Sequence, residues 1–495
     1  MSRPAVAITP ARLPATTLRP EIIEVTVEVP PGKILRYDLD ALVSALELDD
    51  PSLIAVETAG RHGLITLYPH NPLLDMPAPS PADMLMDRRG YITVGRYHNG
   101  RPAKRRMFDT DTGSAQRSLV FGTTGAGKSR TVQYLLACEK RNRVVSWFAD
   151  LKGGQSAPEA AGQVDWRATS QEEAILMLRA AVRVAEARQR RYTAMGRNSF
   201  RIGDPDPLIV VRIDEANRLL EKGAPYRAEA TQLVKELGRT GRSVGVGEEL
   251  DAQASHLEEL GGSDTLRAML KEGEVTLLRW SSSMMRQLVS DGLLPTGAQL
   301  MPIPKNFGAR VLRSQFDLDV EEETTGPGTQ GMGYLLSGPS PTSPMRHFRV
   351  GSVSPTPGLD PEILALYGYE EPERLEAASH DAAGTAYAVR GTPAMQGLIA
   401  AFIQEQAEKA QPVKPRGAGG GSGGGAERAA APRVVDRVRV VLSQADVPMD
   451  AAAVRAAVNA DGGKPVSLGA VKTELGGLVN EGDAHRPSTG LYELT

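Results

Sequence analysis

A glycine-rich loop between a predicted strand and a predicted helix constrains this chain more than any other feature. Residues 122–129 read Gly-Thr-Thr-Gly-Ala-Gly-Lys-Ser, the apolar residues 119–121 precede them, and apolar positions recur at helical spacing over 127–141. Glycines let the backbone turn so that several N–H groups point at phosphate oxygens, and the helix N-terminus adds partial positive charge. The full spacing in this strand–loop–helix context predicts a nucleoside triphosphate site.

Lys128 and Ser129 carry the chemistry of this loop. Lys128 can reach the β- and γ-phosphates, and the Ser129 hydroxyl can ligate Mg²⁺. The alternative is a chance glycine-rich turn ahead of a helix. The loop residues expected to hold ATP are Gly122, Thr123, Thr124, Gly125, Ala126, Gly127, Lys128, Ser129 and Arg130.

A second apolar segment, 208–213, ends in two carboxylates, Asp214 and Glu215. Asp214 is expected to hold Mg²⁺ together with Ser129. Glu215 can orient and activate a water for attack on the γ-phosphate, which favours hydrolysis over simple nucleotide sensing. The alternative is a strand end with two solvated acids. The segment 144–154 also ends in a polar, glycine-rich loop, which belongs at the carboxyl edge of a sheet where ligands bind.

Strands alternate with helices from residue 118 to about 350, which implies an α/β fold with a parallel sheet covered on both faces. The predicted strands are 118–121, 143–149, 208–213, 244–250 and 274–280. The predicted helices are 127–141, 171–195, 226–240 and 264–271.

Composition shifts divide the rest of the chain. The predicted parts are a disordered arm (1–20), a small α+β module (21–80), the ATPase domain (81–350), a Pro/Ala-rich extension with a helix at 394–410 (351–411), a Gly-rich flexible linker (412–432) and a compact final domain (433–495). The final domain reads as three helices and a terminal hairpin, which is typical of a winged helix whose third helix, 467–480, is offered to a DNA groove.

Bulk composition excludes several classes of protein. A net charge of −3 is unlike a basic nucleic-acid coat, so DNA binding would depend on local patches. The single cysteine, Cys138, excludes a disulfide framework and fits a reducing cytoplasmic compartment. No stretch approaches the 18 or more apolar residues of a membrane span. The chain is therefore expected to be cytoplasmic, or to reach the membrane peripherally or through a partner protein.

Several segments together resemble the FtsK/SpoIIIE family of DNA-pumping ATPases. They are the loop at 122–129, Asp-Leu-Lys-Gly at 150–153, Arg-Arg-Tyr at 190–192, Ile-Asp-Glu at 213–215 and the segment 241–253. The resemblance covers about residues 90–350 and is strongest to actinobacterial plasmid-transfer proteins. It implies a RecA-like motor that forms a hexameric ring around double-stranded DNA and works in plasmid transfer or chromosome segregation.

The resemblance also assigns roles to two residues near 250. Gln253 matches the nucleotide sensor of the family, which contacts ATP. Arg242 matches an arginine that reaches the γ-phosphate in the neighbouring subunit, where its charge would stabilise the transition state. Arg239 is a second candidate for that role. An ordinary solvated arginine at a helix end is the alternative for Arg242.

Two strands depart from the family pattern. Arg212 interrupts the apolar strand before Asp214, and residues 247–253 read Gly-Glu-Glu-Leu-Asp-Ala-Gln where the family is apolar. Burying either charge alone would cost several kcal/mol. Because these strands are expected to be neighbours, we predict that Arg212 pairs with Glu249 or Asp251.

The final domain lacks the positive charge that phosphate contacts usually need, because acidic residues slightly outnumber basic ones between 433 and 495. DNA binding would therefore rest on Lys472 and Thr473 of the third helix and on His485 and Arg486 of the wing. A winged helix that docks a protein is the alternative.

Two other functions remain open for the whole chain. One is a protein-export ATPase of the same superfamily, although those tend to carry several ATPase domains in tandem. The other is a nucleotide-switched DNA-binding regulator that does not translocate. Glu215 speaks against a regulator, because a switch does not need a fast hydrolytic base.

Overall fold

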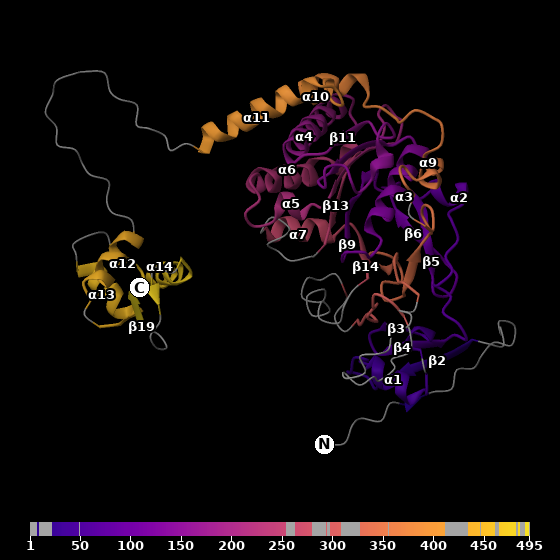
Figure 1. The fold of residues 1–495 in the computed structure, drawn as a ribbon, viewed down its shortest axis with the longest axis horizontal. Coiled ribbons are helices and arrows are strands. Elements are labelled where there is room, and N and C mark those ends of the chain that lie inside the picture. The colour runs from indigo at the N-terminus through magenta and orange to yellow at the C-terminus, as the bar shows by residue number, and fades with distance from the viewer. Residues whose placement is uncertain are drawn as a thin grey trace. The chain divides into compact units, whose positions relative to one another are not determined.

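The computed structural model describes residues 7–8, 22–48, 50–253, 263–279, 294, 298–307, 327–354, 356–410, 434–445, 447–460, 465–481, 484–485 and 491–494. The chain divides into two compact units, residues 1–411 and 412–495 (Figure 1). The predicted linker at 412–432 lies outside the described residues.

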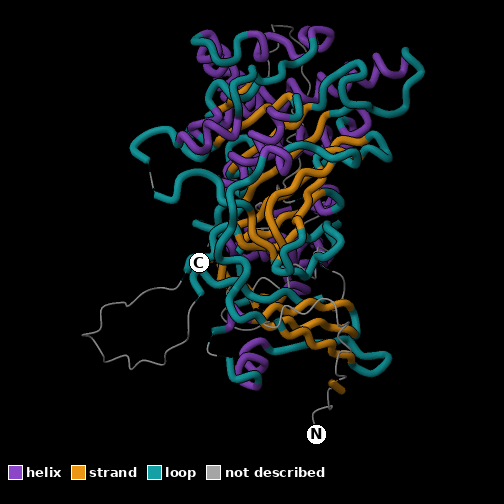
Figure 2. The backbone as a smooth tube through the Cα atoms, turned by 90° about the vertical axis from the view of Figure 1, so that its right-hand side faces the viewer, coloured by secondary structure: helices purple, strands orange, loops and turns teal. Residues whose placement is uncertain are grey.

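A ten-stranded mixed sheet organises the first unit (Figure 2). Its strand order is β11-β10-β12-β13-β9-β14-β15-β16-β5-β6. The strands from β11 to β14 run parallel, and those from β14 to β6 pair antiparallel. Their bounds are β5 Tyr91–Tyr97, β6 Pro102–Arg106, β9 Arg117–Gly122, β10 Val145–Asp150, β11 Trp166–Ala168, β12 Ile209–Asp214, β13 Val246–Ala252, β14 Glu274–Leu278, β15 Met332–Leu335 and β16 Met345–His347.

The predicted parallel sheet is right for the six parallel strands and wrong for β15 and β16, which pair antiparallel; β5 and β6 lie before the segment to which the prediction applied. The five strands placed from the sequence are present with ends shifted by at most two residues. The antiparallel strands β15 and β16 have four and three residues, too few for a clear period. A short turn joins β5 to β6, and such a turn suits antiparallel pairing, because a parallel crossover needs about a dozen residues.

Helices cover both faces of this sheet, on either side of it in Figure 1. One face packs against α3 (Lys128–Arg141) and α9 (Pro361–Tyr367). The other packs against α4 (Gln171–Ala194), α6 (Arg227–Thr240) and α7 (Asp264–Lys271). Successive strand residues point to opposite faces, so Trp147 lies in the core under α4 while Phe148 lies in the core under α3.

The extension at 351–411 packs along the parallel part of the sheet. The predicted helix is α11 (Ala394–Ala410), and the structure adds α9 and α10 (His380–Ala388), which the proline-rich sequence did not predict. Asp165, which precedes β11, binds this segment: its carboxylate accepts hydrogen bonds from Arg390, at 2.7 Å, and from the Tyr387 hydroxyl. The extension therefore belongs to the first compact unit.

A smaller four-stranded sheet forms the N-terminal module, in the order β1-β2-β4-β3. Its elements are β1 Ala7–Ile8, β2 Ile23–Glu28, α1 Leu39–Ala45, β3 Ile54–Ala59 and β4 His62–Leu67. The predicted disordered arm needs correction at Ala7–Ile8, because these residues pair antiparallel with the edge of β2. The rest of residues 1–20 lies outside the described residues.

The second unit has a core of small helices and a three-stranded sheet in the order β17-β19-β18. Its elements are α12 Val434–Ser443, β17 Met449–Asp450, α13 Ala451–Ala460, α14 Leu468–Glu481, β18 Ala484–His485 and β19 Leu491–Leu494. The predicted terminal hairpin is confirmed, since β18 and β19 pair antiparallel.

Two expectations from composition can be compared with the structure. Cys138 is buried and free, as a core residue would be. Over the described part of the chain, no helix combines the length and the apolar character that crossing a membrane requires.

The predicted pairing of Arg212 is confirmed. Arg212 lies opposite Glu249 in the register of β12 and β13, and the two side chains form a buried ion pair. Asp251 lies 3.8 Å from the same guanidinium. Two partners were not predicted: Glu139 of α3 also binds Arg212, and Arg105 of β6 also binds Glu249. Arg212 and Glu249 therefore belong to one buried ionic cluster with Glu139 and Arg105.

Removing one charged side chain from this cluster should destabilise the first unit. We expect Arg212→Leu or Glu249→Leu alone to lower its free energy of unfolding by about 3–5 kcal/mol, because each leaves the buried charges of the cluster unbalanced. The double variant should cost at least about 1 kcal/mol less than the sum of the two. Urea denaturation measures all three. Arg61→Leu, at an exposed ion pair with Glu28, is the control and should cost less than about 1 kcal/mol.

Additive losses from the two substitutions would contradict the pairing, as would a cost at Arg212 no larger than the cost at Arg61.

Candidate nucleotide site

The loop at 122–129 leaves the carboxyl end of β9 and turns into α3. Gly125 and Gly127 have φ values of 74° and 101°, in the left-handed region that favours glycine. Gly127 caps α3 without a side-chain hydrogen bond, so the N–H groups of the first helical turn remain for a phosphate. On its outer side the loop is tied to Gly331, whose N–H donates to the Ala126 carbonyl at 2.8 Å.

Two carboxylates from the end of β12 lie against Lys128. The Lys128 Nζ lies 3.0 Å from Glu215 Oε1 and 3.6 Å from Asp214 Oδ1. All three side chains are buried. Glu215 has a φ of 55°, a left-handed value that a non-glycine residue rarely adopts and that often marks a functional site.

Glu215 is held from three sides. Besides Lys128, Lys152 lies 2.6 Å from Oε1, and the Gln253 amide donates to Oε2 at 2.9 Å. Burial alone would raise the pKa of Glu215, but Lys152 and Lys128 outweigh it and hold the pKa below the ordinary value. Glu215 therefore stays ionised and can accept a proton.

Asp214 fits a magnesium ion. Its Oδ1 accepts the Glu215 N–H at 2.9 Å, while its buried Oδ2 has no hydrogen-bond partner within the described residues. Mg²⁺ is commonly held by one or two carboxylates together with substrate phosphates. With the Ser129 hydroxyl at the start of α3, Asp214 would hold the ion, which when bound neutralises charge on the phosphate oxygens.

The register of the sheet places three aspartates side by side at the carboxyl ends of the strands. Asp150 of β10, Asp214 of β12 and Asp251 of β13 lie opposite one another at the strand ends. Asp150 does not face the nucleotide as a ligand would; its carboxylate accepts the N–H groups of Lys152, Ser156 and Ala157. It thereby shapes the loop that brings Lys152 to Glu215.

A cavity of about 310 Å³ joins these residues. It is lined by Gly122, Thr123, Thr124, Gly125, Gly127, Lys128, Ser129, Arg130, Lys152, Glu215, Gln253 and Gln330. Most of the residues predicted to hold ATP thus meet here, whereas Ala126 is buried behind the loop. Arg130 also binds Asp360 of the extension at 3.0 Å.

Sequence reasoning missed Lys152 and Gln330 as parts of the site. Lys152 had a signal, because a basic residue in a loop at the carboxyl edge can meet the carboxylates of the next strand. Gln330 had none, because it follows a segment without a clear pattern. A neighbouring cavity of about 340 Å³ was also missed. It shares Gly127, Arg130 and Gln330 with the first and has apolar walls from Tyr134, Phe348 and Val350.

Arg242 does not join this site. It lies in a 3-10 turn, Arg242–Val244, at the amino end of β13, whereas Gln253 follows the carboxyl end of the same strand. Seven residues at about 3.3 Å each separate the two ends by roughly 20 Å. Arg239 lies one turn earlier on α6 and is exposed beside Glu236.

The residues predicted to bind DNA lie in the second unit. Lys472 and Thr473 are exposed on α14, and His485 is exposed on β18. Arg486 lies outside the described residues.

Comparison with known proteins gives distant structural likenesses only. No protein-family model and no curated protein matches the chain. The pCW3 conjugation coupling protein TcpA, in a monomer form with ATPγS, is 16% identical with a TM-score of 0.41, over 70% of this chain and 89% of that one. The cytoplasmic domain of the Thermomonospora curvata type VII secretion ATPase EccC is 20% identical with a TM-score of 0.41, over 60% of this chain and 33% of that one.

EssC (ATPases 2 and 3) from Geobacillus thermodenitrificans is 14% identical, with a TM-score of 0.39, over 61% of this chain and 54% of that one. The chain thus spans a third to about half of the secretion ATPase chains.

The geometry of the loop can be tested at Gly127. A Cβ there would lie 2.7 Å from the Gly331 backbone nitrogen, besides requiring a left-handed φ. Gly127→Ala should displace the loop and weaken binding of a fluorescent ATP analogue roughly ten- to a hundredfold. The matched control is Gly162→Ala, where φ is 75° and no atom lies within 4 Å of the added Cβ.

Titration of both variants with the analogue measures the effect, and equal affinities in the two would show that the loop does not hold the phosphates.

Proposed function

We propose that this protein is an ATP-hydrolysing translocase that pumps double-stranded DNA as a hexameric ring. Conjugative plasmid transfer or chromosome segregation would be its process. The observation that carries the proposal is the ionised Glu215, held between Lys128, Lys152 and Gln253 beside the phosphate loop. A carboxylate placed there suits a base that activates water, which is the chemistry an ATP-driven motor needs.

Each side chain of the site would have a defined task. Lys128 and the backbone of 122–129 would bind the phosphates, and in doing so Lys128 would exchange its carboxylate partners for phosphate oxygens. Ser129 and Asp214 would hold Mg²⁺. Glu215 would accept the proton of the attacking water, and Gln253, bonded to Glu215, would respond to the nucleotide state. The neighbouring apolar cavity would take the nucleobase.

The position of Arg242 supports a site shared between subunits. It lies at the opposite end of β13 from Gln253, so it cannot reach the phosphates bound by its own chain. A ring in which the amino edge of one sheet faces the carboxyl edge of the next would let Arg242 stabilise the transition state in trans. Arg239 is the second candidate for this task.

The second unit would guide the motor on DNA. Its order of three helices, a first short strand and a terminal hairpin suits a winged helix, with α14 presented to the major groove and the hairpin as the wing. Lys472, Thr473, His485 and Arg486 would contact the DNA. Several tethered copies in a ring would raise the effective concentration of a weak binder. The protein would work in the cytoplasm or peripherally at the membrane with a partner protein.

The decisive measurement is ATP hydrolysis with and without duplex DNA. We expect duplex DNA to stimulate hydrolysis, and the stimulation to survive truncation after Gln411. Glu215→Gln should lower kcat about 10²- to 10⁴-fold while ATP still binds, because only the base is lost. Glu221→Gln, the same change at an exposed position six residues on, is the control and should behave as wild type.

Two outcomes would contradict this reading. Hydrolysis indifferent to DNA would remove the translocase and favour a protein-export ATPase. Full activity in Glu215→Gln would remove the proposed base and favour a nucleotide-switched regulator.

The role of α14 can be tested by reversing one charge. Lys472→Glu should weaken the binding of the full chain to duplex DNA and reduce the slope of log affinity against log salt by about one. Fluorescence anisotropy with a labelled duplex measures both. Arg455→Glu makes the same change at an exposed position of α13 and should have little effect. Equal effects from the two would favour a unit that docks a protein.

A further inference from the structure

The turn that carries Arg242 is held from inside the protein by Arg188 of α4. Arg188 has 0% of its surface exposed. Its Nη1 donates to the carbonyl groups of Val244 and Gly245, at 3.0 and 3.2 Å, and its Nη2 donates to the Pro207 carbonyl at 3.0 Å. The guanidinium therefore fixes the backbone immediately after Arg242 and links it to the start of β12.

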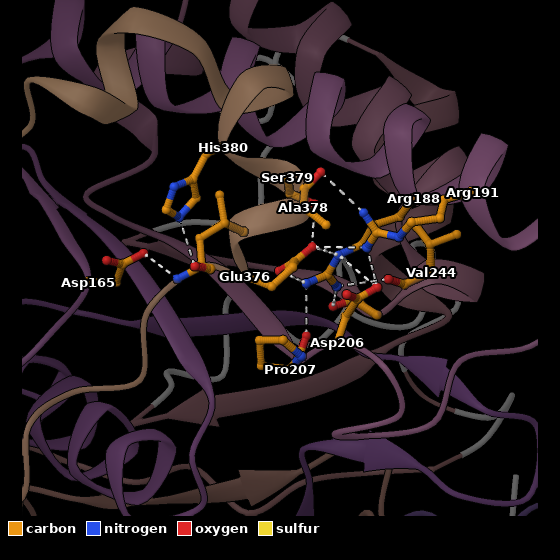
Figure 3. A network of polar contacts seen from close by, with 12 residues as sticks. Asp165, Arg188, Arg191, Asp206, Pro207, Val244, Glu376, Ala378, Ser379 and His380 are labelled. Atoms are coloured by element: carbon orange, nitrogen blue, oxygen red, sulfur yellow. Dashed lines mark hydrogen bonds and ion pairs between the residues drawn. The ribbon is translucent and has the colours of Figure 1, made fainter.

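Arg188 depends in turn on a carboxylate of the extension. Glu376 binds its guanidinium through two hydrogen bonds, Nε to Oε1 at 2.9 Å and Nη2 to Oε2 at 2.7 Å (Figure 3). Such a paired contact fixes the plane of the guanidinium as well as its position. Burial would raise the pKa of Glu376, but Arg188 outweighs it and keeps the pKa below its ordinary value, so the pair stays charged.

Close packing and hydrogen bonds on the other side of the 242–245 turn also restrict its backbone. Gly245 has a φ of 73°, and a Cβ there would lie 2.3 Å from the ring of the buried Phe200. Gly241, just before Arg242, donates its N–H to the Leu237 carbonyl at 2.7 Å and accepts that of Val246 at 2.9 Å. The backbone on either side of Arg242 is therefore clamped between α6, Phe200 and the Arg188 guanidinium.

The extension also contacts the beginning of the helix that leads to Arg242. Phe402 of α11 is buried against Tyr226, with ring centroids 5.1 Å apart, and Tyr226 is the residue that precedes α6. Gln406 donates to Glu229 in the first turn of α6 at 3.2 Å. The extension thus contacts the beginning of α6 directly and the turn after its end through Arg188.

We infer that Glu376, acting through Arg188, is a positioning residue for the trans-acting Arg242, so that the extension sets the activity of the neighbouring ATP site. This inference rests on the proposed function, because it requires Arg242 to act on the next subunit. Glu376 does not line the candidate nucleotide cavity. Its effect on Arg242 passes through Arg188 and the 242–245 turn, while its further contacts are with Arg191 and Ser379.

The first test is the kinetics of Glu376→Gln, which keeps the shape of the side chain and loses its charge. We expect DNA-stimulated kcat to fall about ten- to a hundredfold, since small displacements of a transition-state group cost this much, with KM for ATP changed less than about twofold. Arg188→Lys, which keeps the charge and loses the planar fork, should give the same pattern. Glu373→Gln, in the same extension but paired with the exposed Arg143, is the control and should behave as wild type.

The second test separates positioning in trans from damage within the subunit. Glu376→Gln subunits are mixed with Glu215→Gln subunits, which hydrolyse poorly but retain Arg242 and its supports. Some interfaces in the mixed ring then combine the intact Arg242 turn of a Glu215→Gln subunit with the complete phosphate site of a Glu376→Gln subunit. ATP hydrolysis by the mixture should therefore exceed the mean of the two unmixed variants. Misfolded Glu376→Gln subunits could not contribute such a site.

Mixing Arg242→Ala with Glu215→Gln provides the reference. Recovery in the reference but not with Glu376→Gln would overturn the positioning role and leave the shared site intact. No recovery in either mixture would remove the shared site itself, and the positioning role with it. A raised KM with unchanged kcat in Glu376→Gln would likewise overturn the inference, because it would place the effect in nucleotide binding.

Discussion

The register of the parallel strands decides where this protein concentrates charge. Pairing of β10, β12 and β13 aligns Asp150, Asp214 and Asp251 at one edge of the sheet, on strands spaced only about 4.8 Å apart. The structure distributes this charge among different tasks. Asp150 is satisfied by backbone N–H groups, Asp214 faces Lys128, and burial raises the pKa of Asp251 to about 7 although Arg212 lowers it. This edge therefore favours a bound cation, either the ammonium group of Lys128 or a metal ion that accompanies a phosphate.

The buried ionic cluster two residues further into the sheet protects that register. Arg212 lies opposite Glu249, and Glu139 and Arg105 complete the charge balance. A buried ion pair is weak evidence for stability, because apolar residues of similar size often serve as well. Its clearer consequence is specificity: a one-residue slip of β13 would turn Glu249 to the opposite face and leave Arg212 with Glu139 but without Glu249. The cluster thus raises the free-energy cost of any register in which Asp214 and Asp251 are not aligned.

The parts of the site that depend on motif spacing and on the cost of burying charge could be predicted from the sequence. The loop at 122–129 and the carboxylates at 214–215 follow from spacing, and the pairing of Arg212 with Glu249 follows from the cost of burying charge. Contacts set by chain packing were missed, even at Lys152, where the sequence carried a signal. Lys152 reaches Glu215 because Asp150 shapes its loop, the left-handed φ of Glu215 has no sequence signal, and Glu376 meets Arg188 across 188 residues of chain.

The length of β13 separates the groups at its two ends. Its carboxyl end meets Gln253, Glu215 and the phosphate loop, and its amino end carries the Arg242 turn, roughly 20 Å away for seven extended residues. No side chain spans that distance, so a group at the amino end cannot reach the phosphate loop of its own chain. Under the proposed ring, the rigid strand would couple the two sites that a subunit touches, and the Arg188–Glu376 pair would connect that coupling to the extension. In such a ring, the extension at 351–411, which precedes the linker to the second unit, would also support ATP hydrolysis in the neighbouring subunit.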